Sequence, residues 1–375
     1  MYKIIADKMF DGESILENRA VLFDEEGIHH VGEDTKDEVE ETFKVKFLTP
    51  GFIDIGSGIG LKEESLGKIE GDDWNETTNP VTPELVALDG INPYDIAFAK
   101  AVKGGTLISL VLPGNSNCIG GRGSIILNKG DTVFDMTIKS PFGVKFSINT
   151  EPKSMYSSQK KMPMTRMGIT FLIRESLYKA VEYGKDKKKF SMAEEALLPL
   201  VQGRDIAFFS SYRADDIATS IRISKEFKLK SVILYGTEGN LVSELLKEEN
   251  VPVAYGPLMI PRTSSEIKNL SPKAAAELVE KGIQLALMSG HPIFPSRYLR
   301  LQAGMLVREG ISPEKALKSI TSTPAKILGL NNMGVIKERA MANLIGFDDV
   351  PWETKSQVEK VFIKGKEAYS RRLPM

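Results

Sequence analysis

The middle of the chain alternates short apolar segments with stretches of helical pattern, and this alternation constrains the fold more than any other feature. Two helix starts are marked by a capping serine before a proline, at Ser271-Pro272 and Ser312-Pro313, and a third by Asp215-Asp216. Eight strands with intervening helices predict an α/β protein of the (β/α)₈ barrel type, whose chemistry lies where the strands end. The eight expected strands are 52–55, 106–111, 124–127, 144–148, 206–209, 231–234, 251–254 and 284–288.

Both ends of the chain have a different pattern, with short apolar strands and tight turns. Residues 2–6 and 20–23 are separated by a polar turn, and 358–363 is followed by a turn at Lys364-Gly365. We therefore expect residues 1–50 and 334–375 to form one small β-sandwich domain and residues 51–333 to form the barrel domain. Residues 59–100, in the first strand-to-helix connection, form a long polar insertion that is typical of a covering loop.

Charge and rare residues exclude several classes of function. Lys+Arg 49 against Asp+Glu 50 gives a net charge of −1, which supports neither a nucleic-acid nor an anionic-membrane partner. The single cysteine, Cys118, permits no internal disulfide and no Cys-based zinc site. No signal-peptide pattern and no long apolar run occur, so we expect no membrane span and a cytoplasmic location.

The segment Pro50-Gly51-Phe52-Ile53-Asp54 resembles the one with which the amidohydrolase superfamily opens its barrel. The resemblance spans essentially the whole chain and is closest to the imidazolonepropionase-like amidohydrolases. It implies a barrel with a β-sandwich built from both chain ends, and an ancestral activity on non-peptide C–N bonds. The further matching stretches are 70–73, 89–93, 112–121, 166–168, 213–217, 236–239 and 291–297.

The resemblance also shows where such proteins carry their metal ligands, and this chain has other residues at those places. A shift of one residue would bring Glu151 to the position of Thr150, and Lys145 as a carboxylated bridging lysine is disfavoured by its expected place inside a strand. The substituted positions are Gly56, Gly58, Thr150, Ser210, Tyr235 and Gly290.

These substitutions bear directly on the chemistry. A catalytic zinc needs about three protein ligands, and only then does the pKa of its bound water fall to about 7. Glycine and threonine offer neither imidazole nor carboxylate, and the phenol of Tyr235 is a poor zinc ligand. We therefore expect no metal and no other cofactor. The leading interpretation is a non-hydrolytic relative that binds a small molecule at the barrel mouth or pairs with an active paralogue; a homodimer is a further expectation from the resemblance.

An alternative interpretation is a metal-independent hydrolase that uses His291, Glu238 and Asp54 at the barrel mouth. A carboxylate–imidazole pair performs general acid–base work where the two groups meet. His291 and Asp54 have structural interpretations as well, the latter as an acceptor for backbone N–H groups at the strand ends.

Five further side chains are candidates for ligand binding. Arg213 and Arg297 would hold an anion, or would pair with nearby acids instead. Tyr212 and Tyr235 would contact a ligand, or would fill the volume of the missing imidazoles and block the cavity. Arg122 lies in a glycine-rich stretch that would line a ligand or form a tight turn.

Overall fold

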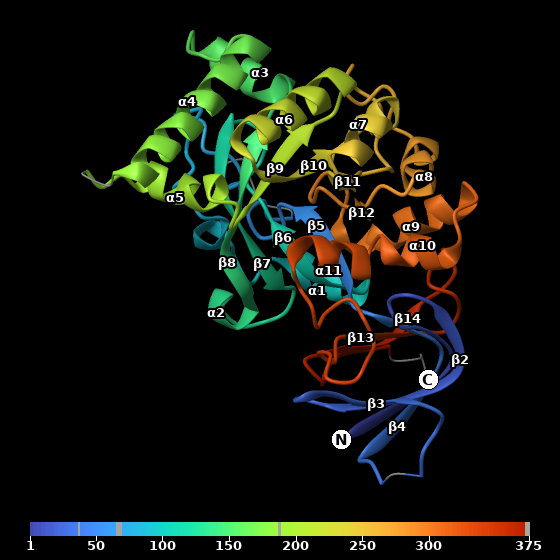
Figure 1. Cartoon of the computed structure of the whole chain (residues 1–375). Helices are drawn as coiled ribbons and strands as arrows, with labels where there is room; N and C mark the ends of the chain where they lie inside the picture. The colour runs from blue at the N-terminus through green and yellow to red at the C-terminus, as the bar shows by residue number, and fades with distance from the viewer. Residues whose placement is uncertain (37, 65–69, 187–188, 372–375) are drawn as a thin grey trace.

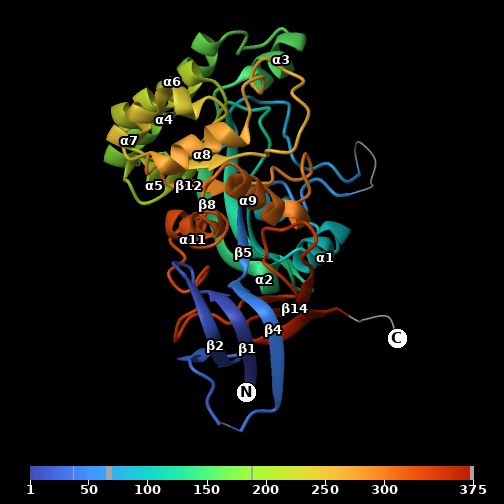
Figure 2. The same cartoon turned by 90° about the vertical axis from the view of Figure 1, so that its right-hand side faces the viewer.

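The computed structural model describes residues 1–36, 38–64, 70–186 and 189–371. The chain forms two β-sheets, one from the middle of the sequence and one from its two ends. In Figures 1 and 2 the helix-covered barrel stands above the terminal sheet, and α3 (Thr150–Ser158) lies at the end of the barrel away from that sheet.

The terminal sheet has seven strands in the order β15-β14-β13-β4-β1-β2-β3. β1 and β4 run parallel, and the other neighbours are antiparallel. Segments from opposite ends of the sequence thus complete one sheet, joined where β13 pairs with β4. The strands are β1 Tyr2–Phe10, β2 Ile15–Asp24, β3 Gly27–Gly32, β4 Glu41–Pro50, β13 Leu344–Phe347, β14 Val358–Ile363 and β15 Lys366–Ser370.

A cluster of aromatic rings curls this sheet. Phe23 on β2 and Phe362 on β14 are separated by three strands, yet their ring centroids are 4.9 Å apart in an edge-to-face contact. Phe43 and Tyr2 pack against Phe362 at 5.3 Å and 6.2 Å. The two wings of the sheet therefore enclose one apolar core, which gives the terminal domain a sandwich-like section.

The second sheet is the predicted barrel, and all eight expected strands occur in it. Their order follows the sequence, from β5 to β12. The first and last strands meet beyond the end of β12, where Gly290 N donates to Gly56 O at 2.9 Å and Gly58 N donates to His291 O at 2.8 Å. The strands are β5 Phe52–Ser57, β6 Thr106–Val111, β7 Ile119–Leu127, β8 Thr137–Ser147, β9 Ile206–Ser211, β10 Lys230–Tyr235, β11 Val253–Tyr255 and β12 Leu285–Leu287.

The barrel departs from the regular (β/α)₈ pattern at its third strand. β7 runs antiparallel to both β6 and β8. The connection from β6 to β7 consists only of residues 112–118, and a parallel pair needs a crossover of about a dozen residues or more. The short connection therefore reverses the chain, and residues 112–118 stay at the carboxyl end of β6, beside the barrel mouth.

The helices cover the outside of the barrel (Figure 1), and their starts follow the predicted capping. Ser271 Oγ accepts from Ala274 N at 3.0 Å, and Ser312 Oγ accepts from Lys315 N at 3.4 Å. No helix in the described ranges is long and apolar enough to cross a membrane. The other helices are α1 Ile96–Lys103, α2 Val133–Met136, α4 Arg166–Lys185, α5 Met192–Val201, α6 Ala214–Phe227, α7 Ser243–Glu248, α8 Pro272–Glu280, α9 Leu299–Arg308, α10 Pro313–Lys318 and α11 Ser322–Leu328.

The aromatic cluster predicts a large effect for a core truncation. Phe362→Ala removes a fully buried ring and should destabilise the protein by about 3–5 kcal/mol. Phe134→Ala is the matched control, because Phe134 is 85% exposed. Thermal unfolding of the two variants checks this expectation, and equal midpoints would contradict the packing described for the terminal sheet.

Candidate functional site

A cavity of about 470 Å³ opens at the barrel mouth, where β8, β9, β10 and β11 end. Tyr212 and Tyr235 lie in its wall, together with Thr150 and Glu151 at the start of α3 and Glu266 from the loop after β11. The remaining wall is largely apolar. It consists of Pro257, Ile260, Pro261, Ile267, Leu270 and Ile293, with Ser154, Thr237, Gly256, Thr263 and Ser264 between them.

The two tyrosines contact each other without filling the cavity. Their rings stack with centroids 4.4 Å apart, and the two hydroxyls are hydrogen-bonded to each other. Tyr235, the last residue of β10, has a φ of 71°, a conformation that a bulky residue rarely adopts. Burial and the charge of Glu151 raise the pKa of Tyr235 to about 12, so at neutral pH its phenol stays protonated.

The Asn115 side chain connects the groups at the base of this cavity. Its amide nitrogen lies within hydrogen-bond distance of three acceptors, Tyr235 OH at 3.0 Å, Glu151 Oε1 at 3.1 Å and Tyr212 OH at 3.3 Å, which share its two hydrogens. Its oxygen accepts from Lys145 Nζ at 2.6 Å. Asn115 lies in the short connection after β6, so the reversal of β7 is what places it here.

Lys145 lies inside β8, as the sequence predicts, and its side chain reaches the barrel interior. Besides Asn115, its ammonium donates to the backbone oxygens of Pro113 at 3.2 Å and Gly114 at 3.3 Å. These three acceptors match its three hydrogens. Burial lowers the pKa of Lys145 to about 7, and the nearby charge of Glu151 opposes this shift in part.

The sequence left open whether Thr150 or Glu151 lies at the family's ligand position, and in the structure both residues line the cavity. Asn149 holds the start of α3, because its side chain accepts from Glu151 N at 2.9 Å and donates to Ser210 Oγ at 2.9 Å. Glu151 is exposed as a residue, but the protein packed around its carboxylate raises its pKa, and the charge of Glu266 adds to this effect.

Glu266 closes the outer side of the site through a charged network. Its Oε1 accepts from Thr150 N at 2.8 Å, from Thr150 Oγ1 at 2.6 Å and from Arg166 at 3.2 Å. The Arg166 guanidinium also donates two hydrogen bonds to the Asp216 carboxylate on α6, at 2.5 Å and 2.9 Å. This network joins α3, α4, α6 and the loop after β11 around one cavity.

The donor set at the family's metal positions does not fit a zinc centre. A Cβ added at Gly58 would lie 2.7 Å from the Trp74 indole, and one added at Gly56 would lie 3.0 Å from Met288 Cε. These side chains therefore occupy the space that imidazoles at the two glycines would need. Within the described ranges, no three or more His, Cys, Asp or Glu side chains are grouped so that they could hold a metal ion.

Asp54 and His291 belong to one buried network on the β5 side of the mouth. The Asp54 carboxylate accepts from Ser289 N at 2.9 Å, from Ser296 Oγ at 2.8 Å and from the hydroxyl of Ser289. Ser289 Oγ in turn accepts from His291 N at 3.0 Å. Burial lowers the pKa of His291, and its Nε2 finds no partner among the described residues. Neither residue lines the 470 Å³ cavity.

Glu238, the third candidate for catalysis, does not join this network. Its carboxylate accepts from Ala214 N at 2.9 Å, at the start of α6, and from Asn269 Nδ2 at 2.7 Å. These bonds tie the loop after β10 to its neighbours, and no hydrogen bond within the described ranges links Glu238 to His291 or Asp54.

The three candidate arginines also lie outside the cavity wall. Arg213 pairs with Asp215 at 2.9 Å, which is the pairing alternative. Arg297 lies over the Tyr298 ring at 4.4 Å, and Arg122 donates to Glu84 O at 3.3 Å. Of the five predicted ligand-binding residues, the structure brings only Tyr212 and Tyr235 to the cavity.

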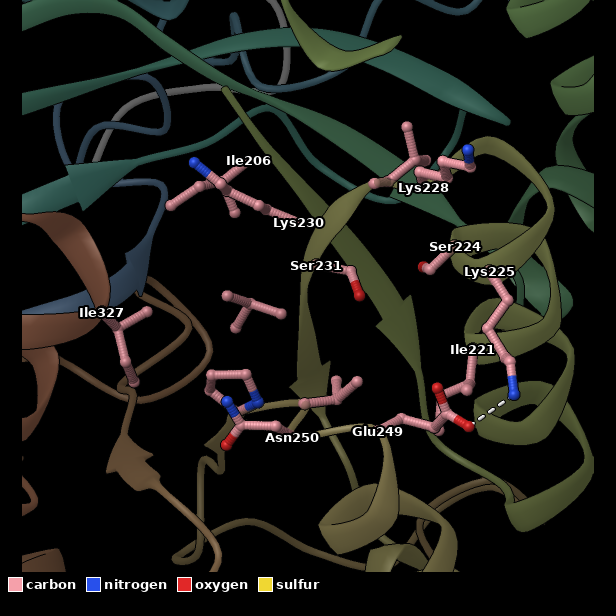
Figure 3. A pocket seen from close by; sticks show the side chains of 14 residues that line it. Ile206, Ile221, Ser224, Lys225, Lys228, Lys230, Ser231, Glu249, Asn250 and Ile327 are labelled. Atoms are coloured by element: carbon pink, nitrogen blue, oxygen red, sulfur yellow. Dashed lines mark hydrogen bonds and ion pairs between the residues drawn. The ribbon is translucent and has the colours of Figure 1, made fainter. Parts of the chain in front are cut away.

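A second hollow, of about 580 Å³, lies at the opposite ends of the strands, beside Ile206 and Lys230 at the starts of β9 and β10. Figure 3 shows that its charged groups do not converge: Lys225 turns toward Glu249, at 2.5 Å, while Lys228 and Lys230 lie on other sides of the hollow. Since barrel chemistry lies at the carboxyl ends of the strands, we take the mouth as the candidate site.

Comparisons with known proteins agree with this architecture. The Amidohydrolase family model matches residues 214–368. A solved amidohydrolase from Thermotoga maritima MSB8 is 36% identical, with a TM-score of 0.94 over 99% of this chain and 100% of that chain. The A. niger ochratoxinase, at 15% identity and a TM-score of 0.64 over 100% of this chain and 96% of that chain, shares the fold.

A curated relative is Amidohydrolase tasK of Hapsidospora irregularis, 25% identical over an alignment that covers 85% of this chain. The chain spans 36% of the length of tasK and 23% of the length of Adenine deaminase 1 from Carboxydothermus hydrogenoformans, another match. The fold and the mouth at the strand ends define a barrel of the amidohydrolase type. The identity and coverage of the Thermotoga maritima protein show that the chain belongs to the amidohydrolase family.

The buried lysine predicts a pH-dependent stability. Between pH 7 and 10 the unfolded chain holds a proton on Lys145 that the folded protein lacks, because folding lowers the pKa from 10.5 to about 7. Stability should therefore rise with pH in this window, by up to about 1.4 kcal/mol per unit. Lys145→Met removes this contribution. The thermal midpoint of the unmodified protein, measured relative to that of the variant, should therefore increase from pH 7 to pH 9.

Lys273→Met, at an exposed position on α8, is the matched control, and its midpoint should follow that of the unmodified protein at each pH. A difference between the unmodified protein and Lys145→Met that stays constant with pH would contradict the lowered pKa.

Proposed function

We propose that this protein is a metal-free member of the amidohydrolase family that binds a small molecule at its barrel mouth and does not hydrolyse it by metal chemistry. One observation carries the proposal. The protein's own side chains, linked by Asn115, occupy the base of the mouth, while a cavity of about 470 Å³ stays open above them.

The chemistry of the donor groups supports the absence of hydrolysis. Activation of water by zinc depends on about three protein ligands, and the positions concerned carry glycine, serine, threonine or tyrosine. The Tyr235 phenol stays protonated near pH 7, so it does not act as a base. Lys145 does not line the cavity, and its side-chain nitrogen is bonded to Asn115 and two backbone oxygens.

The closer relationship to imidazolonepropionase-like amidohydrolases is part of this proposal. It is supported by stretches such as 112–121, which carries Asn115, and 166–168, which carries Arg166. A cytoplasmic location, and a homodimer or an active paralogue as partner, belong to the same proposal and have the resemblance as their only support.

Elemental analysis of protein purified without added metal tests the proposal. We expect substoichiometric zinc, iron and manganese, because no described donor set fits these ions. Hydrolysis of cyclic and N-acyl amides should stay at the background rate, and neither a chelator nor added zinc should change it. Stoichiometric metal together with chelator-sensitive hydrolysis would contradict the proposal.

A further inference from the structure

The surface along α4 carries a concentration of exposed apolar side chains. Between residues 162 and 192, seven large apolar side chains are each more than half exposed, out of fifteen exposed side chains of this kind in the described ranges. Met167, Phe171 and Tyr178 lie on α4 itself, and the other four lie shortly before its start or after its end. Figure 1 shows α4 at the outer edge of the barrel, away from the terminal sheet. So dense an apolar patch is typical of an interaction surface.

The three side chains on α4 share one face of the helix. At 3.6 residues per turn they fall within about 40° of one another, and the residues that α4 buries against the barrel lie on the opposite face. Phe171 and Tyr178 are each 53% exposed, and a hollow of about 510 Å³ lies over the helix between residues 171 and 182. Since the two rings are seven residues apart, about 10.5 Å along the axis, they leave a gap two turns long.

Neighbouring residues fix the Tyr178 ring. It makes an edge-to-face contact with Phe227 at 4.8 Å, and its hydroxyl donates to Glu226 at 3.0 Å, both on α6. Arg174, between the two rings of α4, donates to the same Glu226 at 2.7 Å. A side chain that is already fixed loses little conformational entropy on association, so this part of α4 is suited to binding without rearrangement.

The charged residues beside the rings balance one another. They are two cations, Arg174 and Lys179, and two carboxylates, Glu175 and Glu182. Glu175 and Lys179 pair at 3.3 Å in an exposed position, where such a pair adds little stability and is readily exchanged for another. A strongly acidic or basic partner gains no net attraction here, whereas a second copy brings both signs in equal number. The net charge of −1 adds almost no repulsion between two copies.

We infer that α4 is the interface of a homodimer in which two copies of this helix pack antiparallel about a two-fold axis. Tyr178 of each copy enters the gap between Phe171 and Tyr178 of the other. A ring in the middle of a gap of about 10.5 Å lies about 5 Å from each neighbour, within the roughly 4.5–7 Å that aromatic pairs prefer. The same register brings Glu175 of each copy nearly level with Lys179 of the other on one side of the rings, and the two-fold axis makes this ion pair twice.

The patch is large enough for a stable dimer. A large side chain offers roughly 150–250 Å² of surface, so seven that are more than half exposed offer about 700 Å² in each copy. Two such faces bury about 1,400 Å² together, within the range of roughly 1,200–2,000 Å² of stable interfaces. This inference rests on the homodimer named in the proposed function, to which it assigns a surface and a geometry.

Sedimentation velocity of the full chain tests the inference. The unmodified protein should be dimeric at about 10 µM, and Phe171→Glu, which places a charge among the interleaved rings, should raise the dissociation constant about a hundredfold or more. Phe134→Glu on α2 is the matched control, because Phe134 is 85% exposed and lies outside the patch, and it should leave the constant unchanged. Circular dichroism spectra equal to that of the unmodified protein confirm that both variants fold.

Charge reversal tests the register of the two helices. Glu175→Lys and Lys179→Glu each place like charges beside one another across the interface, so each should raise the dissociation constant about tenfold at low salt. The double variant Glu175→Lys/Lys179→Glu restores opposite charges and should return to within about threefold of the unmodified protein. An equimolar mixture of the two single variants should associate about tenfold more tightly than either alone, because one supplies two cations and the other two carboxylates.

A protein that stays monomeric up to about 100 µM, a dimer that Phe171→Glu leaves intact, or a double variant as weak as the single ones would each overturn the inference. These outcomes are distinct from failure of the proposed function, which is judged by metal content and chelator-sensitive hydrolysis. A metal-free protein that stays monomeric would retain the proposed role in binding a small molecule and lose only the homodimer.

Discussion

The hydrogen bonds of the Asn115 side chain are the interaction on which the mouth of this barrel depends. The amide accepts from a buried ammonium on β8 and donates to a carboxylate and a phenol at the ends of neighbouring strands. Buried polar groups are costly unless each finds a partner, and a buried charge is costlier still. One neutral side chain therefore links Lys145 to Glu151 and contacts the hydroxyls of Tyr212 and Tyr235.

Two features of the backbone make this arrangement accessible. The short connection from β6 to β7 reverses the chain and brings Asn115, with the carbonyls of Pro113 and Gly114, to the end of Lys145. On the other side of the mouth, Gly56 and Gly58 leave room for Met288 and Trp74. The base of the barrel is thereby filled with protein groups, and the remaining space lies between the tyrosines and the loop after β11.

Local patterns in the sequence predict much of the fold and less of the site. The eight strands, the caps at Ser271 and Ser312 and the joining of the two chain ends follow from periodicity, capping residues and the family resemblance. The direction of β7 was not predicted, because an apolar strand has the same pattern in either orientation. Glu266 was also missed, since it lies in an irregular loop and reaches the site only through the fold.

Lys145 and Asn115 also show what local sequence patterns fail to predict about the site. Placing Lys145 inside a strand was right, but alternation alone does not say whether a lysine faces water or the barrel interior, and a lone lysine is usually exposed. Asn115 lies in a stretch that the resemblance singled out, yet its role depends on Lys145 of β8, Tyr235 of β10 and Tyr212, which follows β9. Local sequence patterns do not reveal contacts between residues that are far apart in the sequence.

Anomalous diffraction from crystals grown with zinc would test the central claim most directly, because it locates an ion without assuming its ligands. If the network around Asn115 takes the place of a metal centre, the map at the zinc edge should contain no peak between Lys145, Glu151 and Tyr235, and the distance from Lys145 Nζ to Asn115 Oδ1 should remain near 2.6 Å. A strong peak there, with Glu151 and a displaced Lys145 as ligands, would contradict it.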